Sequence, residues 1–222
     1  MSLNAARQRL VELNMLGVDK LMFEGPVEIN GVHVIAKGTT GVVVKGVRKD
    51  QKVAIKIRRV DANRQSLLSE ATKLRLANTV GIGPRLLAAS RNFLVWSFVE
   101  GIELEEWIPQ ADAKDVRKVV RELFRQAIIL DSLGLIHQEL SRVGNHVMVT
   151  PGLQPVIFDF ETASLSSSRS NLTQLVNALL IRESLISEKV QRAFNVKRDY
   201  ILQIIKVYKK TRNPNSLSVL LS

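Results

Sequence analysis

Three successive runs of β-branched residues stand in the early part of the chain: GVHVIAKG (31–38), GVVVKGV (41–47) and QKVAIKIRR (51–59). Glycine or the polar turn RKDQ separates one run from the next. Val and Ile pack well on a pleated sheet surface, and short polar or glycine-containing turns join antiparallel strands. The pattern therefore predicts an antiparallel meander of three strands.

Other segments surround this meander. Leucines at helical spacing predict a helix over 4–16 with Gly17 as its cap, and a second helix is expected over about 64–77. RLLAAS and NFLVWSFV are expected to be two further strands. An apolar stripe over 116–130 and a second helical pattern over 172–208 follow. We therefore expect an α+β chain with an N-terminal helix (1–17), a β-rich lobe with one inserted helix (18–100), and a helical lobe with a basic tail (101–222).

The composition bears on where in the cell the protein is expected and on which metal ligands it can offer. The 222 residues are 45% hydrophobic, and no apolar run approaches the roughly 18 residues of a membrane span. The start, MSLNAARQRLVELNML, is amphipathic and charged, unlike a signal peptide, so we expect a cytoplasmic protein without membrane contact. The chain has no cysteine, which excludes disulfides and thiolate metal sites. Any metal must be held by oxygen or imidazole.

The charge balance favours a polyanionic partner. The 32 Lys and Arg against 21 Asp and Glu give a net charge of +11, and residues 187–222 hold eight basic residues, Arg212 among them, against two acidic ones. RNA, a ribonucleoprotein or an acidic protein surface would fit this charge. A merely basic surface is the alternative, because no nucleic-acid-binding motif accompanies the charge.

A lysine and a glutamate are expected to form a buried ion pair. Strand alternation in VAIKI puts Ala54 and Lys56 on the sheet face opposite the Val and Ile side chains. Glu70 lies three residues after Leu67 and four before Leu74, hence with the apolar stripe of the next helix. A carboxylate beside a buried helix face is costly unless it is paired, and Lys56 is the obvious partner.

Two glycines and an aspartate add phosphate and metal chemistry. Gly38 and Gly41 lie in a turn where backbone N–H groups could approach phosphates, although any hairpin can use such glycines. Asp159 follows the apolar VIF, where its carboxylate could hold Mg²⁺ or could only shape a turn. His137, Glu139 and Asn145 lie in GLIHQELSRVGNHVMVT (134–150), either a surface turn or the catalytic loop of a phosphoryl-transfer enzyme.

Taken in order, these residues resemble the signature set of protein kinases: glycine loop, VAIK lysine, helix glutamate, an HxD-like loop and a DFG-like aspartate. The resemblance covers residues 30 to about 185. It is strongest to small atypical kinases, namely the RIO family, the kinase subunit of the archaeal KEOPS complex, and archaeal proteins predicted to be serine/threonine kinases. FLVWSFVEG looks like the last strand and hinge of the small lobe, with Trp96 at the gatekeeper position.

The resemblance implies a bilobal kinase-like fold with ATP and Mg²⁺, or Mn²⁺, as cofactors. The usual activation segment of about 20–30 residues is missing, since a helix is expected about ten residues after DFE. The implied catalytic residues are Glu139, Lys56, Asp159 and His137, with His137 bonding backbone near Asp159. The implied metal ligands are Asp159 and Asn145, with His146 as the alternative to Asn145. The implied nucleotide-binding residues are Gly38, Thr39, Thr40, Gly41, Ala54, Lys56, Glu70, Ser97 and Val99.

Three positions depart from the kinase pattern. Ala36 stands in place of the first loop glycine, Glu161 replaces the DFG glycine, and Glu139 replaces the catalytic aspartate. The extra methylene of Glu139 moves its carboxylate by about 1.5 Å, and a shift near 1 Å can cost about 100-fold in rate. Asn145 follows six residues later rather than five, so the backbone could compensate.

The sequence is compatible with three functions. The first is an ATP-dependent serine/threonine protein kinase that could also modify itself within 164–170. The second is an ATP-binding pseudokinase or slow ATPase that acts as a switch in a ribonucleoprotein assembly. The third is a small-molecule kinase, against which the short C-terminal lobe argues.

Overall fold

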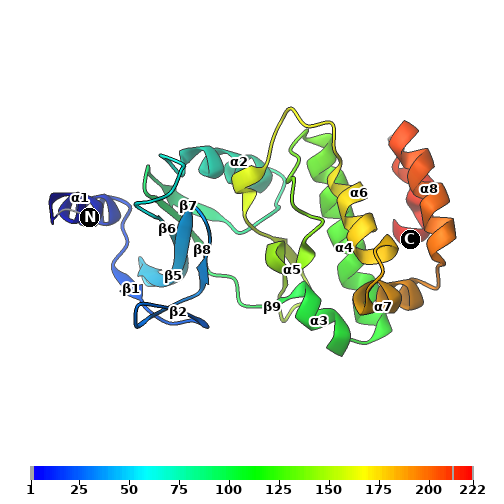
Figure 1. Ribbon diagram of the computed structural model, residues 1–222, viewed down its shortest axis with the longest axis horizontal. Helices are drawn as coiled ribbons and strands as arrows, with labels where there is room; N and C mark the ends of the chain where they lie inside the picture. Colours follow the sequence, from blue (N-terminus) through cyan, green and yellow to red (C-terminus); the bar gives the residue numbers. More distant parts are fainter. Residues whose placement is uncertain (1–2, 212, 222) are drawn as a thin grey trace. The chain divides into compact units, whose positions relative to one another are not determined.

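The computed structural model describes residues 3–211 and 213–221, so Arg212 of the basic tail lies outside the described residues. The chain divides into two compact units of mixed α and β structure (Figure 1). The first unit comprises residues 1–79 and 84–99, and the second comprises 80–83 and 100–222. Among the described residues, no helix is both long enough and apolar enough to cross a membrane.

An antiparallel sheet forms the centre of the first unit. Its strands follow the order β1–β5–β6–β8–β7, with the short β4 also paired to β5. Their bounds are β1 Lys20–Met22, β4 Ala36–Lys37, β5 Gly41–Arg48, β6 Gln51–Arg58, β7 Leu86–Ala89 and β8 Phe93–Ser97.

The three-strand meander is confirmed for its second and third runs, which form the β5–β6 hairpin. The first run is divided. Its beginning, β3 (Val32–Val34), pairs with β2 (Val27–Ile29) in a separate hairpin, and only Ala36–Lys37 joins the main sheet.

Two helices pack in the first unit. The N-terminal helix α1 (Leu3–Met15) buries Leu13 and leaves Leu10 exposed, and its Glu12 carboxylate accepts hydrogen bonds from Asn92 N and Nδ2 at 2.9 and 2.7 Å. Helix α2 (Leu68–Asn78) begins about four residues later than its sequence predicted. The reason is tertiary: Leu67 N donates to Arg91 O at 3.0 Å and holds the preceding segment against another part of the unit.

The two faces of the sheet carry separate hydrophobic layers. Val53 and Ile55 belong to a cluster with Leu13 of α1, whereas Ala54 packs in a second cluster with Leu67 and residues of α2. The alternation that was predicted for β6 is thus confirmed. Lys56 shares the side of Ala54, so it faces the α2 layer.

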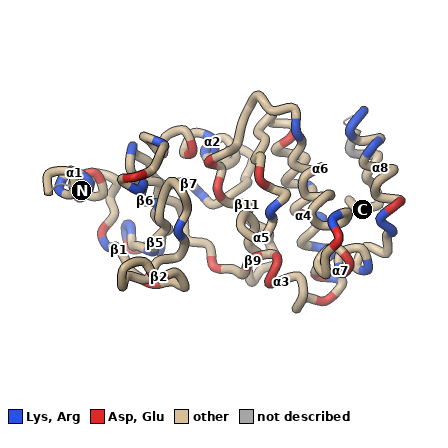
Figure 2. Tube along the Cα trace, viewed as in Figure 1, with Lys and Arg blue, Asp and Glu red and all other residues tan. Residues whose placement is uncertain are grey.

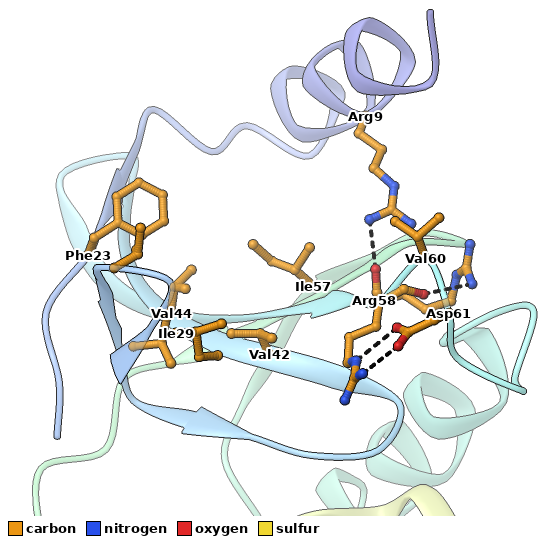
Figure 3. Close-up of a pocket in the computed structure, with 12 residues that line it drawn as sticks. Arg9, Phe23, Ile29, Val42, Val44, Ile57, Arg58, Val60 and Asp61 are labelled. Carbon is orange, nitrogen blue, oxygen red and sulfur yellow. Dashed lines mark hydrogen bonds and ion pairs between the residues drawn. The ribbon is translucent and has the colours of Figure 1, made fainter. Parts of the chain in front are cut away.

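An apolar hollow of about 390 Å³ lies on the face of the sheet that bears Ile57 (Figure 3), which is the face opposite Lys56. Phe23, Val42, Val44 and Ile57 line it. Arg9 closes its edge by donating from Nη1 to the Arg58 carbonyl at 2.7 Å. This hollow is therefore separate from the sheet face that bears Lys56.

The second unit is mostly helical (Figure 1). The predicted apolar stripe lies on α4, which packs against α6 and α7, and every residue of the stripe is buried. The pattern expected over 172–208 is divided into several helices, because Asn195 adopts a left-handed φ of 52° and ends α7. The helices are α3 Leu104–Gln110, α4 Ala113–Ser132, α5 Val143–His146, α6 Asn171–Val176, α7 Leu185–Phe194, α8 Arg198–Thr211 and α9 Ser218–Leu221, with a π-helical turn at Asn177–Ile181 and 3₁₀ turns at Phe160–Thr162 and Pro214–Leu217.

A small three-stranded sheet completes this unit. It has the antiparallel order β11 (Pro155–Ile157), β10 (Val147–Val149) and β9 (Ile102–Glu103). Gly101 lies so close to β10 that an added Cβ would stand 2.6 Å from the Val149 carbonyl oxygen. The hairpin of β10 and β11 is thereby fixed beside the start of α3.

Candidate active site

Lys56 and Glu70 form a buried ion pair in the first unit. Lys56 Nζ donates to Glu70 Oε2 at 2.8 Å, and the side chains are 8% and 6% exposed. Strand β6 presents the lysine and the first turn of α2 presents the glutamate. The pairing expected from the sequence is present, and it turns a costly buried charge into a fixed one.

The turn between β4 and β5 lies beside this pair. Gly38 N donates to the Gly41 carbonyl at 2.8 Å, and Arg59 N donates to the Thr40 carbonyl at 2.8 Å. A Cβ on Gly41 would lie 2.9 Å from both Lys56 Cγ and the Ile57 carbonyl oxygen. Gly41 therefore has a steric role, since its missing side chain leaves room for the stem of Lys56. Thr39 is exposed, whereas Thr40 is buried.

The expected adenine-contacting segment lies at the end of β8. Ser97 pairs with Val53 and Ala54 pairs with Trp96 in the β6–β8 ladder. Ser97 N already donates to the Arg85 carbonyl at 2.9 Å. Val99, partly buried, is the last residue of this unit.

In the second unit, the proposed metal ligands Asn145 and Asp159 lie near the same end of the β10–β11 hairpin. Val147 faces Ile157 in the β10–β11 register, and Phe158 N donates to the His146 carbonyl at 2.8 Å just beyond the ladder. Asn145 precedes His146 and Asp159 follows Phe158, so the two residues adjoin the partners of this hydrogen bond. Asn145 is exposed, and His146 is buried.

His137 is a buried, neutral histidine. Its Nε2 lies 2.7 Å from the Phe158 carbonyl oxygen, so Nε2 carries the proton and donates. Burial lowers the pKa of His137 to about 4, against the opposing effects of this hydrogen bond and of the Asp159 and Glu139 charges. The expected bond to backbone beside Asp159 is confirmed. Burial likewise lowers the pKa of His146, whose ring lies edge-on to His137 at 5.1 Å.

Glu139 is held by a residue that the sequence did not single out. Thr162 Oγ1 donates to Glu139 Oε2 at 2.8 Å and lies 3.1 Å from the His137 carbonyl oxygen. The other carboxylate oxygen of Glu139 lies 3.8 Å from Arg142 Nη1. The Thr162 hydrogen bond therefore orients the carboxylate, while 30% of the Glu139 side chain stays exposed.

Two residues of this region have strained backbones. Asp159 has φ 62° and ψ 69°, and Gln138, between His137 and Glu139, has φ 72°. Non-glycine residues rarely adopt this left-handed conformation, and such strain gathers at functional sites. Asp159 is itself a carboxylate proposed for phosphoryl transfer, and Gln138 directly precedes the other one, Glu139.

Buried hydrogen bonds fix the loop that carries His137, and sequence analysis missed them. Asn171, which is fully buried, accepts from His137 N and donates to the Leu135 carbonyl, both at 2.8 Å. Asp131 accepts from Asn171 N at 2.7 Å and from Ser170 Oγ at 2.6 Å. Ser170 before an apolar helix signals a helix start, but nothing in the pattern shows that Asn171 reaches back 34 residues.

The chain is 30% identical over 116 residues to the uncharacterized protein MJ1211 of Methanocaldococcus jannaschii. The alignment covers 51% of this chain and 97% of that protein. The chain therefore belongs to the same family as this archaeal protein. No family model matches the chain.

Proposed function

We propose that this chain is an ATP-dependent serine/threonine protein kinase of the atypical, RIO-like type, with magnesium-assisted phosphoryl transfer. The observation that carries the proposal is the buried Lys56–Glu70 pair beside the Gly38–Gly41 turn. A buried lysine that a carboxylate holds in one position is suited to orient phosphates. Phosphoryl transfer depends mainly on such positioning and on neutralising charge.

The second unit would supply the metal ligands. Asp159 offers a carboxylate, and Asn145, near the same end of the β10–β11 hairpin, offers an exposed amide oxygen; both are ligand types that suit Mg²⁺. A bound Mg²⁺ would neutralise charge on the phosphate oxygens. His146 is less suited, because its ring is buried against His137.

Glu139 would orient the attacking hydroxyl and accept its proton. A carboxylate has about four lone-pair sites, so the Thr162 hydrogen bond leaves capacity for a substrate hydroxyl. The hydrogen bond from Thr162 orients the longer side chain, and the exposed Arg142 adds only a weak attraction. This fixation supports activity despite the extra methylene.

The test is transfer of the radiolabelled γ-phosphate of ATP, with Mg²⁺ or Mn²⁺, to the chain itself and to a generic protein acceptor. We expect label on serine or threonine in the wild type and its loss in Asp159→Asn and Glu139→Gln. ATP binding is measured in parallel with Lys56→Met. The matched control is Lys52→Met, which removes an exposed lysine from the same strand. Equal ATP affinity in the two lysine variants would contradict the proposed nucleotide site.

Binding of ATP without label transfer would favour the second function, a nucleotide-gated binding module. Glu139 in place of aspartate and the net charge of +11 speak for that alternative. Label on a small hydroxylated metabolite, with none on protein, would favour the third.

A further inference from the structure

A hollow of about 390 Å³ in the second unit is lined by five residues, all of them Lys or Arg and all from α4. We call it the α4 basic groove. Its residues are Lys114, Arg117, Lys118, Arg121 and Arg125. Figure 2 marks the positions of Lys and Arg along the trace.

Helical geometry places these cations in a row. Their spacing of three or four residues puts them on one side of α4. With a rise of 1.5 Å per residue, the row from Lys114 to Arg125 extends about 16 Å along the helix. The groove is therefore an elongated cationic surface.

Neighbouring elements fix three of the side chains. Arg117 Nη1 donates to the Ala193 carbonyl at 2.6 Å, and Arg125 Nη2 donates to the Leu221 carbonyl at 3.0 Å. The guanidinium of Arg121 lies over the Phe194 ring, 5.7 Å from its centroid. Arg121 Nε is buried and has no hydrogen-bond partner among the described residues.

Acidic side chains do little to compensate this charge. None of the described carboxylates lines the groove, and Glu122 approaches only Arg125, at 3.8 Å. Like charges at i and i+4, such as Lys114 with Lys118, destabilise a helix. A bound anion would remove that repulsion.

The shape and chemistry of the groove favour one class of anion. Pockets for small organic ligands are mostly apolar, and this one is lined by cations alone. A strand within a double helix advances about 3.4 Å per phosphate along the axis, and an extended single strand advances further, so the row of about 16 Å can meet more than one successive phosphate. The lining residues include neither the aromatic nor the amide side chains that would stack on or read adenine bases.

We propose that the α4 basic groove binds the phosphate backbone of a nucleic acid without reading its sequence. Lys114 and Lys118, which are exposed, make the phosphate contacts, and the three fixed arginines supply the surrounding positive potential. This binding is independent of phosphoryl transfer.

The test is fluorescence anisotropy of a labelled, unstructured 20-nucleotide RNA against the full chain over a range of salt concentrations. The variant is Lys114→Gln/Lys118→Gln. The matched control is Lys209→Gln/Lys210→Gln, which removes two exposed lysines of α8 in the same unit. Thermal unfolding verifies that both variants are folded.

Each phosphate contact to a single strand contributes about 0.7 to the slope of log K against log salt. We expect the α4 variant to lower the slope by about 1.4 and the affinity at 0.1 M salt by about 10- to 30-fold. The control should stay within about twofold of the wild type. An equal loss in both variants would mean that overall charge drives binding and would overturn the assignment.

Competitors identify the class of partner. Single-stranded DNA of the same length should displace the RNA with similar strength. If polyglutamate or vesicles with anionic lipid displace it at equal charge concentration, and this displacement also depends on Lys114 and Lys118, the partner is an acidic protein or a membrane surface and the nucleic-acid proposal is wrong. Absence of RNA binding at low salt would overturn it too.

Discussion

Lys56 Nζ of strand β6 lies 2.8 Å from Glu70 Oε2 of helix α2, and both side chains are less than 10% exposed. Two charges removed from water in this way stabilise one another only while both are present. The stability of the first unit should therefore fall when either partner is replaced alone.

Glu70→Leu should destabilise the protein by about 3–5 kcal/mol, because it leaves the ammonium group of Lys56 buried without its partner. The double variant Lys56→Met/Glu70→Leu should recover most of that loss, since well-packed apolar side chains can replace a buried ion pair. Urea unfolding of both variants measures the difference. A double variant no more stable than the single one would show that the unpaired ammonium group of Lys56 is not the cause of the loss in Glu70→Leu.

Gly41→Ala should weaken both folding and ATP binding. Its Cβ would lie 2.9 Å from Lys56 Cγ and from the Ile57 carbonyl, so strand or side chain must move, at a cost of about 1–3 kcal/mol. Gly38→Ala is the matched control, because its nearest neighbour would lie at 3.6 Å, an ordinary contact. Denaturant unfolding and ATP titration should show lower stability and weaker binding for Gly41→Ala than for Gly38→Ala. Equal effects of the two substitutions would contradict the steric role of Gly41.

Thr162→Val should reduce phosphoryl transfer about 10- to 100-fold, because the Glu139 carboxylate loses the hydroxyl that orients it. Thr162 acts as a positioning residue, so the KM for ATP should change little. Thr162→Ser keeps the hydroxyl and should retain most of the activity. Steady-state kinetics of the wild type, Thr162→Val and Thr162→Ser measures these rates. Equal rates for the Val and Ser variants would refute the positioning role of the Thr162 hydroxyl.

The neutral His137 should make stability depend on pH. Its pKa is about 4 when folded and 6.5 as a free side chain, so between these values the unfolded chain binds more protons. Stability is then fully present above about pH 6.5 and falls as the pH drops towards 4. Protonation of His137 below its folded pKa should lower the free energy of unfolding by about 3 kcal/mol.

Urea unfolding at pH 7 and pH 4.5 measures this loss. His137→Gln removes the titrating group while its amide can still donate to the Phe158 carbonyl. The variant should show a smaller difference between the two pH values. An unchanged pH dependence would assign the effect to other groups, with His146 as the first candidate, since the pKa of His146 is also lowered.

The local sequence pattern by itself determined which side chains of β6 and α4 are buried and which residues form the buried ion pair. Alternation in VAIKI placed Lys56 and Ile57 on opposite faces, and the apolar period over 116–130 identified the buried stripe of α4. Both follow from the geometry of a single strand or helix, which sequence spacing reports directly. The Lys56–Glu70 pair could be foreseen because an unpaired buried charge is so costly that few partners were possible.

Only the tertiary structure decided the rest. Hydrogen bonds between distant segments shorten α2 at its start, bring Asn171 to the loop of His137 and place Thr162 on Glu139. The α4 basic groove likewise depends on distant residues. The Ala193 carbonyl and the Phe194 ring of α7 hold Arg117 and Arg121, and the Leu221 carbonyl holds Arg125. Such contacts join residues tens of positions apart, and no periodicity in the chain records them, because they exist only once packed elements bring these residues together.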